Sequence, residues 1–400
     1  MEFTSKYKRE EIEALLDLVG EESIKPKPKW TGHADAEGLK AIGWTDEDIQ
    51  YYQENGVNWN AEDDEYHKVS DDNKALYGVL TADNISTYKD RIVYLPKIDM
   101  SAKTSMSQMF LDCKNLIAIP LLNINNFKSM YKTFYNCHSL VCIPLLDTSQ
   151  VEDMEQVCYG CYNLQYVPEL DTQNVTTLRY AFYSCYSLEH FPLLNTSNVI
   201  NMEYTFSACM NLTTLPLLDT GKVEKMTAIC SGSRSFAIFP KLNTSKVTSI
   251  SSAFSDCYSL KKIENIDLGN ATSIGYMCQN CYSLVDFPPL DTIKVTSMNS
   301  TFNNCTCLKT VLLLDVQNLA DMNAFNSLNV VILNLRNLKL SLYLTKSPLL
   351  SKDSLLYIIN NEAATSAITI QLASYAYTRL ANDADVVAAL ANHPNITLAK

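Results

Sequence analysis

Two pairs of cysteines stand at the spacing that metal sites and redox sites use. Residues 158–161 read CYGC, and residues 278–281 read CQNC. A CxxC pair holds two thiolates close enough for one tetrahedral zinc ion or for one thiol–disulfide exchange. One pair supplies only two of the four ligands of a structural zinc site, and no pair of histidines lies near either motif. The residues around the four cysteines must decide which chemistry applies.

Both motifs belong to a repeat of 24 residues. Its register holds from Ile92 to Ile332, which predicts ten coils and a last strand. The cysteine column holds Cys113, Cys137, Cys161, Cys185, Cys209, Cys257, Cys281 and Cys305, with Ser233 in its gap, and a proline column holds Pro96, Pro120, Pro144, Pro168, Pro192, Pro216, Pro240 and Pro288. Columns in one register predict a solenoid, in which each coil buries its apolar face against its neighbours.

The repeat favours packing over chemistry for the four cysteines. Cys158 and Cys278 stand in a column otherwise filled mostly by phenylalanine, and Cys161 and Cys281 belong to the cysteine column itself. The two pairs are five coils apart, about 24 Å at the spacing of neighbouring strands, so they cannot share one zinc ion. We therefore expect small, buried, reduced thiols, and neither a metal nor another cofactor.

One coil, residues 137–160, illustrates the expected local structure. Leu140, Ile143 and Leu146 are typical of a short strand, and Pro144 limits how far its pairing can run. Residues 147–149 (DTS) supply turn and N-cap oxygens. Apolar residues then recur at i, i+3, i+7 and i+10 from Val151, which is the stripe of a short helix. The predicted fold class is an α/β repeat solenoid of strand–turn–helix coils.

Charge and composition exclude several classes of protein. The net charge is −12, and residues 1–100 carry −10 of it, with 12 Lys and Arg against 22 Asp and Glu, so we expect no nucleic-acid partner. No apolar run approaches the roughly 18 residues of a membrane helix, so we expect no membrane insertion. The charged start, MEFTSKYKREE, does not resemble a signal peptide, which predicts cytoplasmic synthesis. None of the five histidines stands in a nucleophile motif, and no Gly-rich phosphate loop is present, so we expect no enzyme.

The repeat SL-x-x-IP-x-LDTS-x-V-x-x-M-x-x-x-F-x-x-C closely resembles the BspA-type leucine-rich repeats. That resemblance covers about 240 residues and implies a non-enzymatic binding protein. The flanks, KYKREEIEALLDLV, WTGHADAEGLKAIGWTDEDIQYY and the segment from Ser351, resemble tail and fibre proteins of phages and prophages of gut anaerobes. Together they imply a virion tail component that recognises a host cell. A bacterial cell-surface adhesin and an intracellular scaffold remain the alternatives.

Four domains follow from these boundaries. Residues 1–31 form a helix and linker that would attach to other virion tail proteins, and residues 32–91 form a small acidic helical cap. Residues 92–332 form the solenoid. Residues 333–400 form an α/β cap with a helix from Ser351, a strand at residues 367–372 and a final helix. The sequence leaves open whether identical chains associate into a homo-oligomer.

Exposed, non-periodic aromatic residues are the candidate binding site. They concentrate in two adjacent coils, where one patch could present several rings, and tyrosine buries a large area at low entropic cost while carrying a hydroxyl. The alternative is that the rings stack from coil to coil and serve stability. The candidate residues for a host cell-surface protein or glycan are Tyr159, Tyr162, Tyr166, Tyr183, Tyr186 and His190.

Overall fold

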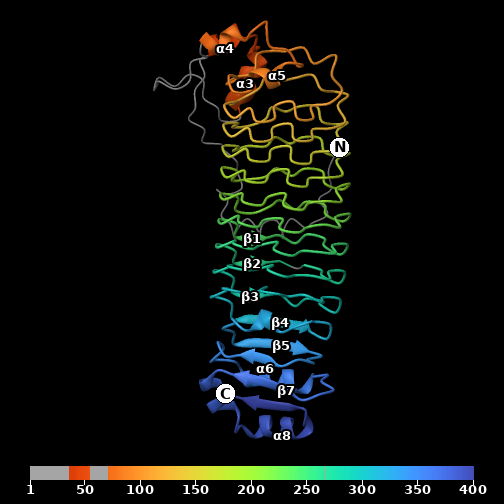
Figure 1. The fold of residues 1–400 in the computed structure, drawn as a ribbon, viewed down its shortest axis with the longest axis vertical. Helices are drawn as coiled ribbons and strands as arrows, with labels where there is room; N and C mark the ends of the chain where they lie inside the picture. The colour runs from red at the N-terminus through yellow and green to blue at the C-terminus, as the bar shows by residue number, and fades with distance from the viewer. Residues whose placement is uncertain (1–35, 55–70, 265) are drawn as a thin grey trace. The chain divides into compact units, whose positions relative to one another are not determined.

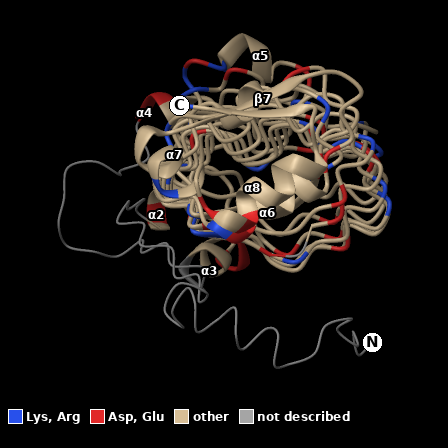
Figure 2. Ribbon diagram, turned by 90° about the horizontal axis from the view of Figure 1, so that it is seen from below, with Lys and Arg blue, Asp and Glu red and all other residues tan. Residues whose placement is uncertain are grey.

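The computed structural model describes residues 36–54, 71–264 and 266–400. These residues divide into two compact units, which we describe separately. Unit 1 comprises the described residues as far as Thr176, with Tyr180–Thr196 and Cys209–Leu218, and unit 2 comprises Thr177–Arg179, Ser197–Ala208 and the described residues from Asp219 to Lys400. Each unit is a stack of coils (Figure 1), with charged residues of both signs around the periphery of the coils (Figure 2). None of the described helices is long and apolar enough to span a membrane.

Unit 1 begins with short helices and continues as coils. Its helices are α2 (Ala36–Ala41), α3 (Asp46–Glu54), α4 (Asp71–Ala75) and α5 (Ile85–Tyr88). Successive coils then pair in parallel through single bridges between residues 24 positions apart, such as Tyr94 with Ala118 and Cys142 with Tyr166. Each coil is therefore completed by its neighbours, as expected of a solenoid.

Unit 2 adds short strands to the same coils and ends in an α/β segment. Its strands are β1 (Ile238–Phe239), β2 (Lys262–Ile263), β3 (Asp286–Phe287), β4 (Thr310–Asp315), β5 (Ile332–Arg336), β6 (Leu342–Leu344), β7 (Ile368–Leu372) and β8 (Ile396–Ala399). The helices are η2 (Asn323–Phe325), α6 (Lys352–Asn360), α7 (Ser374–Leu380) and α8 (Ala384–Asn392). Parallel sheets have the orders β1-β2, β3-β4-β5 and β6-β7-β8.

Proline limits the strands as predicted. Strands β1 and β3 each end directly before a proline of the column, Pro240 and Pro288. In β4 the same position is Leu312, and that strand runs on to Asp315. Proline has no N–H to donate to the neighbouring coil, but β2 also ends at this position, before Glu264, so proline is not the only reason that a strand ends there.

The prediction of a short helix in every coil is wrong: the described part of residues 92–332 contains no α-helix. In nine successive coils, two residues four positions apart adopt left-handed backbone conformations instead, for example Gln108 (φ 57°) and Asp112 (φ 59°), and the tenth coil has the short 3-10 helix η2 in place of the pair. The N–H of Gln108 donates to Tyr131 at 2.8 Å and that of Asp112 to Tyr135 at 2.8 Å, each in the next coil. An α-helix would direct these N–H groups back to residue i−4 of the same coil. The segment is an arc whose hydrogen bonds join one coil to the next.

The last part of unit 2 matches the sequence only partly. Helix α6 follows Ser351, whose hydroxyl accepts from the N–H of Ser354 at 3.1 Å, as the predicted helix start requires. Strand β7 lies within the predicted residues 367–372. The helix predicted after this strand is present as α8, but a further helix, α7, precedes it, and strand β8, which pairs with β7, follows it; neither α7 nor β8 was predicted.

Candidate functional site: aromatic ladders and the strand row

The cysteines form a structural column. Of the 13 cysteines, 12 are buried and only Cys307 is exposed. The Sγ of Cys161 donates to the carbonyl of Phe134 at 3.0 Å, and Ser233, in the gap of the column, donates to the carbonyl of Phe206 at 2.7 Å. The same bond to a carbonyl 27 residues earlier recurs at Cys137, Cys185, Cys209, Cys257, Cys281 and Cys305. The column thus forms hydrogen bonds between each coil and the preceding one.

Burial keeps these thiols neutral. It raises the pKa of Cys113 and that of Cys209 to about 12. In the CYGC motif, burial is also the main cause that raises the pKa of Cys161, followed by the hydrogen bond with Cys158. A protonated thiol is a poor nucleophile and a poor metal ligand. Among the residues that the structure describes, no three or more His, Cys, Asp or Glu side chains are grouped to hold a metal ion.

Two ladders of stacked rings run through three successive coils of unit 1. Tyr159 lies between Tyr135 and Tyr183, with ring centroids 4.6 and 4.7 Å apart and planes within 9° of parallel. In the second ladder Tyr162 lies between His138 and Tyr186, at 4.4 and 4.8 Å. These rings are half-buried. The structure therefore brings together four of the six predicted residues, namely Tyr159, Tyr162, Tyr183 and Tyr186.

Stacking determines what the ladders can offer to a ligand. Each inner ring has both faces covered by its neighbours, so the ring edges and hydroxyl groups remain for contact. Burial raises the pKa of Tyr159, and the neighbouring Tyr135 and Tyr183 add to that effect, so the hydroxyl stays a proton donor at neutral pH. Lys132 lies 5.2 Å from the centre of the Tyr135 ring, which places a cation at one end of the first ladder.

Tyr166 and His190 belong to a different row, the strand row, which also contains Tyr94, Ala118 and Cys142. Tyr166 is bridged to Cys142 and packs against a buried cluster that includes helix α3, so it is half-buried where the sequence analysis expected an exposed ring. His190 is also half-buried, and burial lowers its pKa. These two residues join the strand row and not the ladders.

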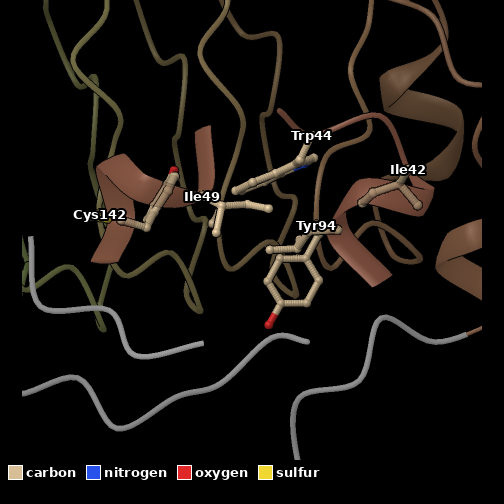
Figure 3. Packing of buried hydrophobic residues seen from close by; sticks show 8 residues of the cluster. Ile42, Trp44, Ile49, Tyr94 and Cys142 are labelled. Carbon is tan, nitrogen blue, oxygen red and sulfur yellow. The ribbon is translucent and has the colours of Figure 1, made fainter. Parts of the chain in front are cut away.

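The helical cover of the strand row was not predicted from the sequence. Leu39, Ile42, Trp44, Ile49 and Tyr52 form one buried cluster with three residues of that row, Tyr94, Ala118 and Cys142. Figure 3 shows Ile42, Trp44 and Ile49 gathered with Tyr94 and Cys142. The Trp44 and Tyr52 rings lie 5.4 Å apart. Helix α3 thus covers the side of several coils, because one apolar helix face meets residues that stand 24 positions apart.

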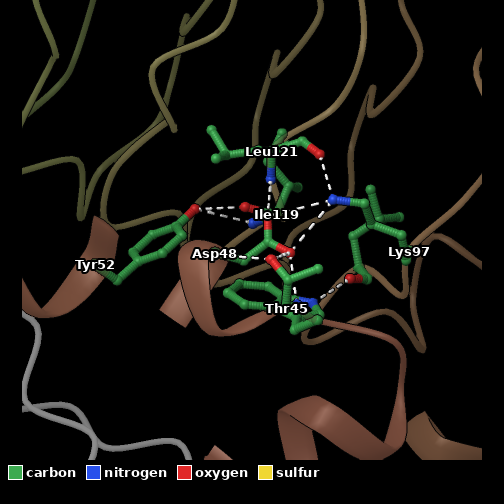
Figure 4. A network of polar contacts seen from close by, with 8 residues as sticks. Thr45, Asp48, Tyr52, Lys97, Ile119 and Leu121 are labelled. Atoms are coloured by element: carbon green, nitrogen blue, oxygen red, sulfur yellow. Dashed lines mark hydrogen bonds and ion pairs between the residues drawn. The ribbon is translucent and has the colours of Figure 1, made fainter. Parts of the chain in front are cut away.

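A polar network holds α3 against the coils (Figure 4). The carboxylate of Asp48 is fully buried, and it accepts from the N–H of Leu121 at 2.7 Å and from the hydroxyl of Thr45 at 2.8 Å. Lys97 lies 3.3 Å from the same carboxylate and balances its charge. The hydroxyl of Tyr52 donates to the carbonyl of Ile119 at 2.6 Å. A buried carboxylate with this many donors fixes the helix in one position.

Several solved structures are similar to this chain. A leucine-rich repeat protein from Bacteroides ovatus ATCC 8483 is 16% identical, with a TM-score of 0.34 over 77% of this chain and 92% of that chain. A leucine rich cell surface protein from Faecalibacterium prausnitzii A2-165 is 17% identical, with a TM-score of 0.29 over 62% and 84%. A leucine-rich repeat protein of T. pallidum is 21% identical, with a TM-score of 0.32 over 42% and 76%. No curated protein matches the chain.

A protein-family comparison covers the repeat itself. One family model matches residues 86–166, 128–238, 186–286 and 209–314, which together span more than half of the chain. These matches overlap because the same 24-residue coil recurs throughout the region. The chain belongs to the family described as "Mycoplasma protein of unknown function, DUF285".

Proposed function

We propose that this chain is a non-enzymatic binding protein whose ligand surface is the pair of aromatic ladders in unit 1. The observation that carries the proposal is that half-buried rings from three successive coils lie in two ordered ladders, with Tyr159 and Tyr162 at their centres. Ordered tyrosines lose little entropy on binding and offer both apolar area and hydroxyl groups. The coils supply a rigid support for such a surface.

The geometry favours a protein ligand over a glycan. A sugar would dock by laying its ring on an aromatic face, and the faces of Tyr159 and Tyr162 are covered by the rings above and below. Ring edges and a row of hydroxyls suit the mixed polar and apolar surface of a protein. We therefore propose a host cell-surface protein as the first candidate and a host glycan as the second.

The biological setting that we propose is a bacteriophage tail or tail fibre, with residues 1–31 attaching to other tail proteins. The resemblance of the flanks to phage and prophage proteins supports this setting. The second candidate is a bacterial cell-surface adhesin. Mass spectrometry of purified virions from the source organism, beside a cell-surface fraction of uninfected cells, separates the two. Finding the chain only in the surface fraction would contradict the virion proposal.

The binding proposal is tested by removing two hydroxyls while keeping the stacks. In the double variant Tyr159→Phe and Tyr162→Phe the rings still stack, so the unfolding midpoint should stay close to that of the unchanged chain. Binding of the purified chain to susceptible cells should weaken by about 1–3 kcal/mol if these residues are anchors. The control is Tyr258→Phe with Tyr282→Phe, a ring pair of unit 2 at 5.1 Å. A further variant, Tyr159→Ala, removes a ring from the stack. If both variants bind as the unchanged chain does, and Tyr159→Ala also has a lower unfolding midpoint, the ladders are purely structural.

A further inference from the structure

The proline column leaves a series of backbone carbonyls without a partner in the next coil. In unit 2, Glu264 stands at a position of this column and its N–H donates to the carbonyl of Phe239, 25 residues earlier, at 2.9 Å. Pro120, Pro144 and Pro168 occupy the same position in unit 1 and have no N–H to donate. The carbonyls 25 residues before them are those of Leu95, Ile119 and Ile143. A buried carbonyl that is left unpaired costs about 1–3 kcal/mol.

The segment from Trp44 to Tyr52 supplies a donor to each of these three carbonyls. Nε1 of Trp44 donates to Leu95 at 2.8 Å, and the hydroxyl of Tyr52 donates to Ile119 at 2.6 Å. The hydroxyl of Tyr51 donates to Ile143 at 3.3 Å. Three aromatic side chains, those of Trp44, Tyr52 and Tyr51, therefore supply the hydrogen-bond donors that the three prolines lack.

The same segment also pairs a row of backbone N–H groups on these coils. The N–H of Lys97 donates to the carbonyl of Ile42 at 3.1 Å, and the N–H of Leu121 donates to Asp48. Residues 97 and 121 are one coil apart. Helix α3 and the residues before it thus follow two periodic rows of the strand face, one of carbonyls and one of N–H groups.

Both rows continue past the edge of α3. The next carbonyl is that of Val167, whose coil partner would be Pro192, and the next N–H groups are those of Leu145 and Glu169. In the described part of the chain no hydrogen bond engages any of these three groups. Exposed apolar side chains flank them, with Leu145 at 51% and Leu193 at 63% exposed. The half-buried Tyr166 connects this region to the α3 cluster.

We propose that this region, the open strand face of Leu145, Tyr166, Val167, Glu169 and Leu193, docks a segment of a partner protein that carries an aromatic O–H or N–H donor and a carboxylate. The aromatic donor pairs with the carbonyl of Val167, and the carboxylate accepts from the N–H of Leu145. The ring and its apolar neighbours cover Leu145 and Leu193. The surface is continuous with the α3 interface and uses the same periodic groups, so a short helix with the chemistry of α3 fits beside it. This site is distinct from the ladders, and it goes beyond the proposed function.

The probe is a fluorescent peptide of residues 44–54, WTDEDIQYYQE, added to the full chain. The control peptide carries Asp48→Asn, Tyr51→Phe and Tyr52→Phe. The proposal expects saturable anisotropy changes with the first peptide and roughly thirtyfold weaker binding with the second, since one hydrogen bond of this kind is worth about 1 kcal/mol and two are lost. Equal binding of the two peptides, or no binding of either, would overturn the proposal.

Pro192→Ala tests the site itself. It restores an N–H to the coil, which then donates to the carbonyl of Val167 as Glu264 does to Phe239, so it closes the open carbonyl while leaving the resident α3 untouched. Peptide binding should fall about fivefold, because one hydrogen bond of about 1 kcal/mol is lost. The matched control is Pro288→Ala, which restores the same N–H opposite Ile263 in unit 2 and should leave binding unchanged.

Equal binding in both variants would show that the peptide merely displaces α3. If the chain self-associates and the peptide dissociates these oligomers, the occupant of the site is a second copy of the chain. That result would refute the partner proposed here.

Discussion

At the scale of single residues, the cysteine column does more than fill space. The sequence predicted small buried thiols, and burial is confirmed for every cysteine of the column. The 24-residue spacing alone did not indicate that the thiol also donates to the carbonyl of the previous coil. Ser233 was the available signal, because a hydroxyl in a column of buried thiols indicates that the position requires a donor.

The hydrogen bond of the column predicts an order of stability among substitutions. Cys161→Ala should remove one of the two donors to the carbonyl of Phe134, which still accepts from the N–H of Cys137 at 3.1 Å, and should cost about 0.5–1.5 kcal/mol, whereas Cys161→Ser keeps a donor and should cost less. Urea denaturation of the two variants measures the difference. Two variants of equal stability would mean that the sulfur contributes only its volume.

Burial also predicts which thiol reacts. In the native chain an alkylating reagent at pH 8 should label Cys307 and leave the 12 buried cysteines unmodified, because the pKa values of Cys113 and Cys209 lie near 12 and their sulfur atoms are buried. Mass spectrometry before and after denaturation counts the labels. Replacing Cys307 with serine should remove the native label. Rapid native labelling at the column would contradict the packing described here.

At the scale of elements, predictions from the sequence were reliable wherever one residue type has one physical effect. The 24-residue period, the strand limits at proline and the start of α6 follow from the leucine, proline and Ser351 positions. The arcs did not follow, because their apolar spacing resembles that of a helix. A signal was present in the residue before each column cysteine, which is often Asp, Asn or Gly, the residues that tolerate left-handed backbone. The packing of α3 on the coils was not predictable either. It depends on the unpaired carbonyls of the coils, and residues 36–54 contain no periodic pattern that would indicate this contact.

The arcs predict that two glycines differ in their tolerance of alanine. Gly160 has φ 71°, and a Cβ there would lie 2.6 Å from Oδ1 of Asn136, so Gly160→Ala should cost about 1–3 kcal/mol. Gly232 has φ 76°, but its nearest neighbour is 3.6 Å away. Gly232→Ala should therefore cost only the backbone strain and should be the milder change. Thermal unfolding of both variants measures the comparison, and a larger loss at Gly232 would be inconsistent with this account.

At the scale of the whole molecule, the stability of each coil depends on its neighbours. The arc and strand hydrogen bonds run from one coil to the next, so a terminal coil lacks partners on one side. The residues from Ala36 to Tyr88 and the sheet β6-β7-β8 occupy the two ends of the repeat in the sequence. Because α3 covers the strand row as well, removing it should affect coils beyond the first.

Two truncations test where the folded molecule begins. Deleting residues 1–31 should leave the unfolding midpoint unchanged, because no column of the 24-residue register extends into this segment. Deleting residues 1–54 removes Trp44, Asp48, Tyr51 and Tyr52, and it leaves several backbone groups of the first coils unpaired at about 1–3 kcal/mol each where they stay buried. Hydrogen exchange should then rise across residues 94–146 of unit 1 and stay unchanged in β6, β7 and β8. If the proposed attachment role holds, the shorter deletion should already abolish incorporation into virions, while hydrogen exchange in the coils stays native. Equal protection of residues 94–146 in both truncated chains would show that α3 contributes nothing to the folded repeat, and a loss of folding in the shorter deletion would place the boundary of the cap before residue 32.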